Sequence, residues 1–142
     1  MKIWAFMYAI IWVSFVQILF IVFTPLDDQL SLAVHVPVGV LVFVLAFIVS
    51  RQIGKSACPA RIKRITKTTM FLAILQGVLG LVLAAAVIYN LGSTIVTAID
   101  FLHVANALAI ITQASSSSTA YDMWEEKEFQ TVESATVPAP KA

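Results

Sequence analysis

Apolar residues dominate long stretches of this chain, and short polar segments separate the stretches from one another. Uncharged runs extend from Ile3 to Leu26, from about Leu32 to Ser50 and from Thr68 to Ile99. The third run resumes after Asp100 and continues to Ala120. A helix needs about 20 residues to cross about 30 Å of hydrocarbon. Each run is therefore long enough to span a membrane.

The last run is too long for one span, so the chain must turn back within it. The segment Tyr89-Asn90-Leu91-Gly92-Ser93 is the natural break, because Asn, Gly and Ser favour turns. The pattern predicts four spans, at about residues 3–23, 32–50, 68–88 and 94–115. Residues 1–120 would form an all-α, integral membrane four-helix bundle. Residues 121–142 would form an acidic cytoplasmic tail that is partly disordered.

Charged residues are scarce and unevenly placed. They make up 12% of the chain, whereas a soluble domain carries roughly 25%. Six of the nine basic residues lie between the second and third predicted spans: Arg51, Lys55, Arg61, Lys63, Arg64 and Lys67. The positive-inside rule places this loop in the cytoplasm, which predicts a multi-pass protein of the cell membrane with both termini cytoplasmic. The net charge of +1 gives no reason to expect a nucleic-acid partner.

Two histidines lie within the predicted spans, and the chain has no others. With the basic loop in the cytoplasm, His35 lies near the outer end of the second span. His103 lies about 13 Å into the fourth at 1.5 Å per residue, so both fall in the outer half of the membrane. An ionisable residue in lipid is costly and marks a functional site. Two imidazoles on different helices can hold one haem iron from opposite faces. Since no Cys-x-x-Cys-His attachment motif is present, we predict haem b.

Small residues follow both histidines at helical spacing. Gly39 and Ala107 each lie four positions after a histidine and share its helix face, so we expect them to make room for a porphyrin. We assign Gly77 and Gly80 to ordinary helix packing. The simpler alternative for the histidines is a hydrogen bond to a polar neighbour, as we expect for the other polar residues in the spans: Gln17, Gln76, Asn106 and Gln113.

Asp100 precedes His103 by three residues and lies on the same face of the predicted helix. A carboxylate in lipid is expensive unless it is paired or protonated. Asp100 could accept a hydrogen bond from an imidazole, relay protons, or join His35 and His103 in a copper or zinc site. These alternatives stay open.

The arrangement resembles one four-helix half of the haem A synthase family over about residues 1–115. The likeness rests on a histidine in the second span, a basic loop, Gln76-Gly77-Val78-Leu79-Gly80 in the third span, and Leu102-His103 in the fourth. It implies a bundle that binds haem through both histidines, and an oxidoreductase that modifies haem. Leu32 stands where the family has a Glu that takes part in the chemistry, and Val36 where it has an Arg. Asp100 keeps the same spacing from the other histidine and is therefore our candidate catalytic residue.

These observations together predict a b-type cytochrome-like membrane protein with bis-His ligation, for electron transfer or haem handling. Besides the membrane lipid, its expected partner is another membrane protein or a second copy of the chain, and quinol is a candidate electron donor. Two alternatives stay open. One is an accessory transmembrane subunit of a larger oxidoreductase complex, without its own cofactor. The other is a haem A synthase-like enzyme.

Overall fold

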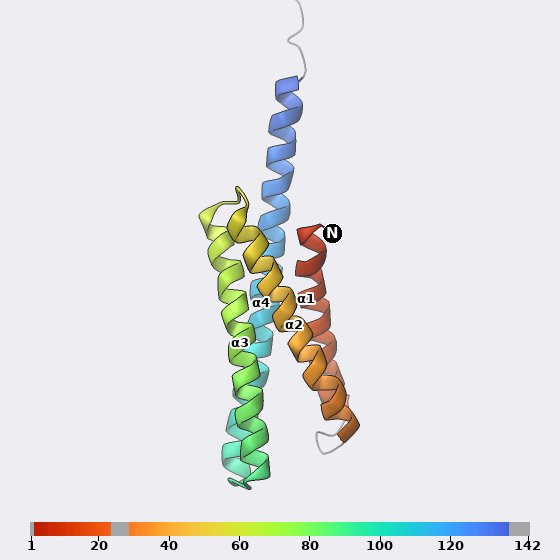
Figure 1. Cartoon of the computed structure of the whole chain (residues 1–142), viewed down its shortest axis with the longest axis vertical. Coiled ribbons are helices and arrows are strands. Elements are labelled where there is room, and N and C mark those ends of the chain that lie inside the picture. The colour runs from red at the N-terminus through yellow and green to blue at the C-terminus, as the bar shows by residue number, and fades with distance from the viewer. Residues whose placement is uncertain (1, 24–28, 137–142) are drawn as a thin grey trace, which may run out of the picture.

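The computed structural model describes residues 2–23 and 29–136, with side chains for 2–23 and 33–131. It consists of four helices, α1 (Ile3–Phe23), α2 (Gln29–Lys55), α3 (Ala60–Ile88) and α4 (Ser93–Thr136) (Figure 1). Each is long and apolar enough to cross a membrane, which confirms the predicted all-α, four-helix fold. Asp27, Asp28 and the proline-containing residues 137–142 lie outside the described residues.

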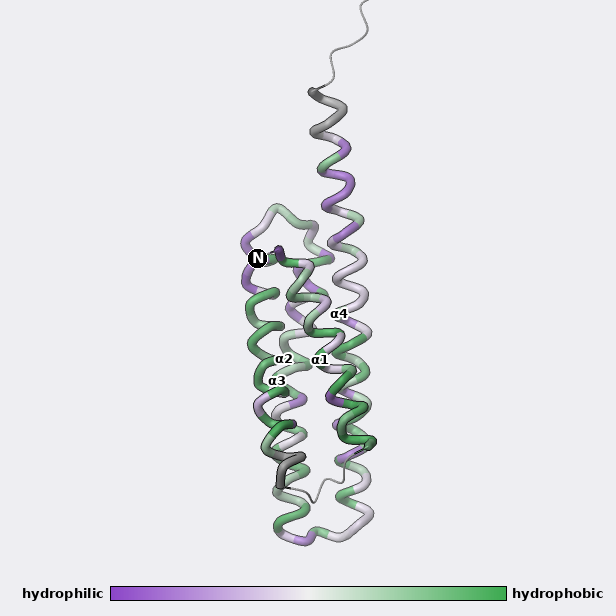
Figure 2. The backbone as a smooth tube through the Cα atoms, turned by 90° about the vertical axis from the view of Figure 1, so that its right-hand side faces the viewer, coloured by the Kyte–Doolittle hydropathy of each residue, from purple (hydrophilic) through white to green (hydrophobic). Residues whose placement is uncertain are grey.

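The helices form an up-and-down bundle. Each packs against its neighbours in sequence, and α1 also packs against α4. As a result, α2 and α4 face each other across one diagonal, and α1 and α3 across the other. The start of α1 and the α2–α3 turn lie at one end, which we call the basic end (Figures 1 and 2). The α3–α4 turn lies at the opposite end, which we call the far end.

The buried core gathers at the basic end of the bundle. Fully buried side chains occupy positions 7–14 of α1, 42–53 of α2, 62–73 of α3 and 106–121 of α4. Among the described side chains of these helices, Ala86 near the far end is the exception. The α1–α2 pair diverges from the α3–α4 pair toward the far end (Figure 1). The bundle is therefore closed at the basic end and open at the far end.

Small hydroxyl side chains account for the close packing at the basic end. Ser14, Thr66, Thr69, Ser117 and Ser118 are all buried there, and small residues let helix backbones approach closely in membranes. The Thr66 hydroxyl donates to the carbonyl oxygen of Ile62 at 3.2 Å. Thr69 and Ser117 also bond within their own helices, so these hydroxyl groups need no partner on another helix. The hydroxyl groups of Ser14 and Ser118 have no hydrogen-bond partner in the described chain.

Backbone features shape the far end. Pro37 lies inside α2, two residues after His35, and a proline removes one backbone hydrogen bond from its helix. Asn90 and Gly92 adopt φ values of 51° and 92° in the α3–α4 turn. Asn and Gly are the residues that tolerate this left-handed region. The turn predicted at residues 89–93 is therefore confirmed.

α4 extends well beyond the segment predicted to span the membrane. It is one continuous helix of 44 residues, about 66 Å long at 1.5 Å per residue. The Tyr8 hydroxyl donates to Oδ2 of Asp122 at 3.2 Å, which places Asp122 level with the first turns of α1. The described side chains after Trp124 are exposed, and the helix projects alone from the bundle (Figure 1). A fall in hydropathy marks where a membrane span ends, but it does not end a helix. Residues 93–136 contain no Gly or Pro, so α4 continues.

Asn106 connects α4 to α3. Its Nδ2 atom donates to the carbonyl oxygen of Leu72 at 2.9 Å and to Oε1 of Gln76 at 2.7 Å. Gln17 similarly connects α1 to α2, since its Nε2 atom donates to the carbonyl oxygen of His35 at 2.6 Å. The interhelical role predicted for these three amides is confirmed.

We expect Asn106→Ala to lower the free energy of unfolding by about 1 kcal/mol, within the range measured for interhelical hydrogen bonds in membranes. The substitution leaves the Gln76 amide oxygen without its donor. Chemical unfolding in detergent, followed by circular dichroism, measures the effect. Thr112→Ala is the control, because the Thr112 hydroxyl bonds only within α4, to Leu108. An equal loss in both variants would contradict a special role for Asn106.

Candidate functional site

His35 and His103 meet across the diagonal between α2 and α4. Their ring centroids lie 6.1 Å apart, and the ring planes are inclined by 48°. Both side chains are half-buried, just beyond the closed core on the far-end side. The structure therefore brings together the two residues that the sequence singled out.

Both imidazoles carry a polar atom without a partner. Nδ1 of His35 and Nδ1 of His103 are buried, and neither forms a hydrogen bond with any part of the described chain. A buried polar atom left unpaired costs about 1–3 kcal/mol. The simpler alternative, in which each ring hydrogen-bonds a polar neighbour, is therefore wrong for these two nitrogen atoms. Two unpaired nitrogen atoms on neighbouring rings favour a histidine pair that binds a ligand.

Gln17 of α1 supports the backbone at His35 through the hydrogen bond already described. A Cβ atom on Gly39 would lie 3.9 Å from Nε2 of Gln17, and no imidazole atom comes within 4 Å of it. These are ordinary van der Waals distances, so the Gln17 amide does not require a glycine here, and the predicted role of Gly39 beside a porphyrin stays a prediction. The sequence predicts only general interhelical bonding for Gln17, and the structure places its side chain against the backbone of His35.

Gly80 of α3 is the glycine that lies against a histidine ring. A Cβ atom at this position would lie 3.2 Å from Cε1 of His103 and 3.8 Å from its Nδ1. The sequence predicts helix packing for Gly80, and the structure places it beside the His103 ring. Gly80 lies four residues after Gln76 on the same face of α3. The Gln76 side chain accepts a hydrogen bond from Asn106, which lies three residues after His103 on α4.

Asp100 and Ala107 lie on α4 on either side of His103, and both are half-buried. Among the described residues, no three His, Cys, Asp or Glu side chains are grouped closely enough to hold a metal ion. Asp100 therefore does not complete a three-ligand copper or zinc site with His35 and His103. The two histidines alone form the candidate ligand set.

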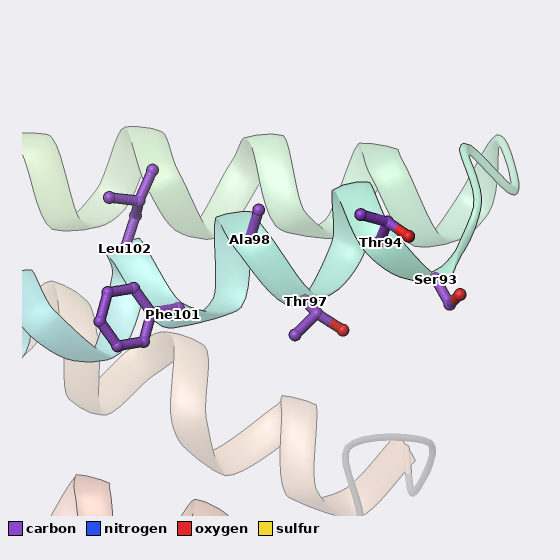
Figure 3. Close-up of a pocket in the computed structure, with 6 residues that line it drawn as sticks. All are labelled: Ser93, Thr94, Thr97, Ala98, Phe101 and Leu102. Atoms are coloured by element: carbon purple, nitrogen blue, oxygen red, sulfur yellow. The ribbon is translucent and has the colours of Figure 1, made fainter.

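An open groove of about 710 Å³ follows α4 from its first residue to the turn that carries His103. Three hydroxyl residues and three apolar residues line it: Ser93, Thr94, Thr97, Ala98, Phe101 and Leu102 (Figure 3). The lining residues all come from α4 and are exposed. They lie about half a turn around the helix from His103, so the groove is on the outward face of α4 and does not open onto the histidine pair.

The spacing of the two histidine rings is compatible with one metal ion between them. A metal–imidazole bond is about 2 Å long, so two imidazoles that hold one metal ion from opposite sides have centroids roughly 6 Å apart. The observed separation is 6.1 Å. The His103 ring packs against Gly80. If a haem binds here, His35 and His103 are the side chains that would hold the iron.

Comparison with protein-family models, with curated proteins and with solved structures gives no match for this chain. The likeness to haem A synthase therefore rests on the sequence motifs, and the function has to be argued from the geometry of the site.

Gly80→Ala tests whether the space beside His103 matters. The added methyl group would lie 3.2 Å from Cε1 of His103, so the ring must move. Gly77→Ala adds the same group to the same helix with no atom within 4 Å, and both changes favour the helix equally. We expect Gly80→Ala to lower the haem content of the purified protein at least threefold, and Gly77→Ala to leave it unchanged. Equal haem content in both variants would show that His103 needs no such space.

Proposed function

We propose that this chain is a membrane protein that binds haem b between His35 and His103 and acts in electron transfer or haem handling. One observation supports the proposal above the others. Two imidazoles face each other at 6.1 Å in the open half of the bundle, each with a buried and unpaired nitrogen atom.

A bound haem would supply one-electron redox chemistry at its iron. If both His35 and His103 hold the iron, the chain would leave no open site for oxygen, which favours electron transfer over oxygen activation. Gln17 fixes the segment of α2 that carries His35, through the carbonyl of that residue. Gly80 lets the His103 ring keep its position. The chain thus orients its two ligands from all four helices.

Quinol is the electron donor we propose. The groove on α4 offers the hydroxyl groups of Ser93, Thr94 and Thr97 beside the aromatic ring of Phe101. Hydroxyl groups can bond the oxygen atoms of a quinol ring, and an aromatic ring can pack against it. The groove lies on the exposed face of α4, about half a turn around the helix from His103, so a quinol bound there would pass electrons to the haem across α4.

The orientation we propose places the basic end in the cytoplasm of a cell, with both chain termini on that side. The six basic residues in the last turns of α2 and the first turns of α3 support it. The segment from Thr68 to Glu126, which includes the far-end turn, contains no Lys or Arg.

Impermeant maleimide labelling tests this orientation. Cys58 is buried and is replaced by Ala. Leu91→Cys then puts a thiol in the far-end turn, and Phe129→Cys puts one on the exposed α4 extension; both native side chains are at least half exposed. We expect Leu91→Cys to react in intact cells and Phe129→Cys to react only after lysis. The reverse labelling pattern would show that the far end, not the basic end, faces the cytoplasm.

An absorption spectrum of the purified chain tests the proposed cofactor. We expect a sharp α-band on reduction with dithionite and about one haem per chain, since one histidine pair holds one iron. His35→Ala and His103→Ala should each remove most of the haem. Ser14→Ala is the control, because it alters a buried side chain of the closed core instead.

The other candidate functions appear as distinct outcomes of the same experiment. No α-band, together with stoichiometric copper or zinc by elemental analysis, would favour a metal site. A chain with no chromophore and no metal that purifies with membrane partners would favour an accessory subunit. Conversion of haem O in cells that express only this chain would favour the haem A synthase-like enzyme, although Leu32 replaces that family's Glu.

A further inference from the structure

The outward face of α3 changes character along its length. Near the basic end it carries the exposed side chains of Arg61, Arg64 and Lys67, and it continues toward the far end with exposed apolar side chains. These are Phe71, Leu75 and Val78. We call these six residues the α3 stripe. Their spacing of three or four residues keeps them on one side of the helix, while the opposite side is buried in the bundle.

The basic part of the α3 stripe has no paired carboxylate among the described side chains. The chain contains no Asp or Glu between Asp28 and Asp100. Within residues 2–23 and 33–131, none of the three basic side chains forms an ion pair with a carboxylate. The ammonium group of Lys67 instead lies 5.9 Å from the centre of the Phe71 ring. Positive charge therefore sits directly above the apolar part of the stripe.

We propose that the α3 stripe binds one anionic phospholipid of the cytoplasmic leaflet. The phosphate would bind Arg61, Arg64 and Lys67, since guanidinium groups donate paired hydrogen bonds to phosphate oxygens. The acyl chains would lie along Phe71, Leu75 and Val78. A free phosphate would contact only the basic residues of the stripe, whereas a phospholipid would contact both the basic and the apolar residues. This inference rests on the proposed membrane orientation and is independent of haem.

Native mass spectrometry of the purified full chain tests the site, with dioleoylphosphatidylglycerol and dioleoylphosphatidylcholine as probes. The acyl chains are identical, so only the headgroup differs. Each basic residue near an anionic membrane surface contributes about a fivefold gain in binding. We expect the wild-type chain to retain the anionic lipid at least tenfold better than the neutral one, and R61Q/R64Q/K67Q to lose that preference. R64Q alone should lower the preference for the anionic lipid about fivefold. This single variant keeps the test decisive if the triple variant does not fold.

The matched control is R51Q/K55Q/K63Q, which removes the same charge from the basic end, at the end of α2 and the start of α3, but leaves the stripe intact. It should keep most of the preference. An equal loss in both triple variants would overturn the proposal, because the lipid would then respond to the overall charge of the basic end. Equal retention of the two lipids by the wild-type chain would also overturn it. Haem content, measured on the same samples, reports the proposed function separately.

Discussion

The two helix pairs pack closely at one end of the bundle and separate at the other, and the candidate site depends on this difference. In a membrane, lipid would surround all four helices, so their association would rely on close packing and interhelical hydrogen bonds. Small buried side chains such as Ser14 and Ser117 allow that packing at the basic end. Further toward the far end, the side chains of Gln17, Gln76 and His103 are larger and polar, and the main core ends there.

The polar half of the bundle is organised around the histidine pair. α2 and α4 contribute His35 and His103, α1 contributes the Gln17 hydrogen bond, and α3 contributes the space at Gly80. Any ligand held between the rings therefore contacts a site built from four helices. Such a ligand would stabilise the folded chain, because it binds an arrangement that the unfolded chain lacks. Few side chains are buried at the far end of the bundle. The imidazole nitrogen atoms of His35 and His103 therefore have few neighbouring groups with which to form hydrogen bonds.

The ends of the molecule separate its chemical features. The far end is short of charge and carries the groove on α4. The basic end carries the cationic residues at the end of α2 and the start of α3, and the acidic part of α4 projects beyond it as a continuous helix. This separation keeps charged groups away from the histidine pair, with the exception of Asp100, which lies one turn from His103. A low local charge density favours a site that binds an apolar macrocycle.

Much of this architecture follows from the order of residues alone. Backbone groups in lipid must be satisfied within each segment, so four apolar runs mean four helices, and Asn90 with Gly92 marks the far-end turn. The facing histidines could be anticipated because both lie in the same half of the predicted membrane. The contact between Gly80 and the His103 ring could not: helical spacing tells which residues share a face, but not which helix lies opposite that face. The order of the helices around the bundle and their rotation set that choice, and these came only from the tertiary packing.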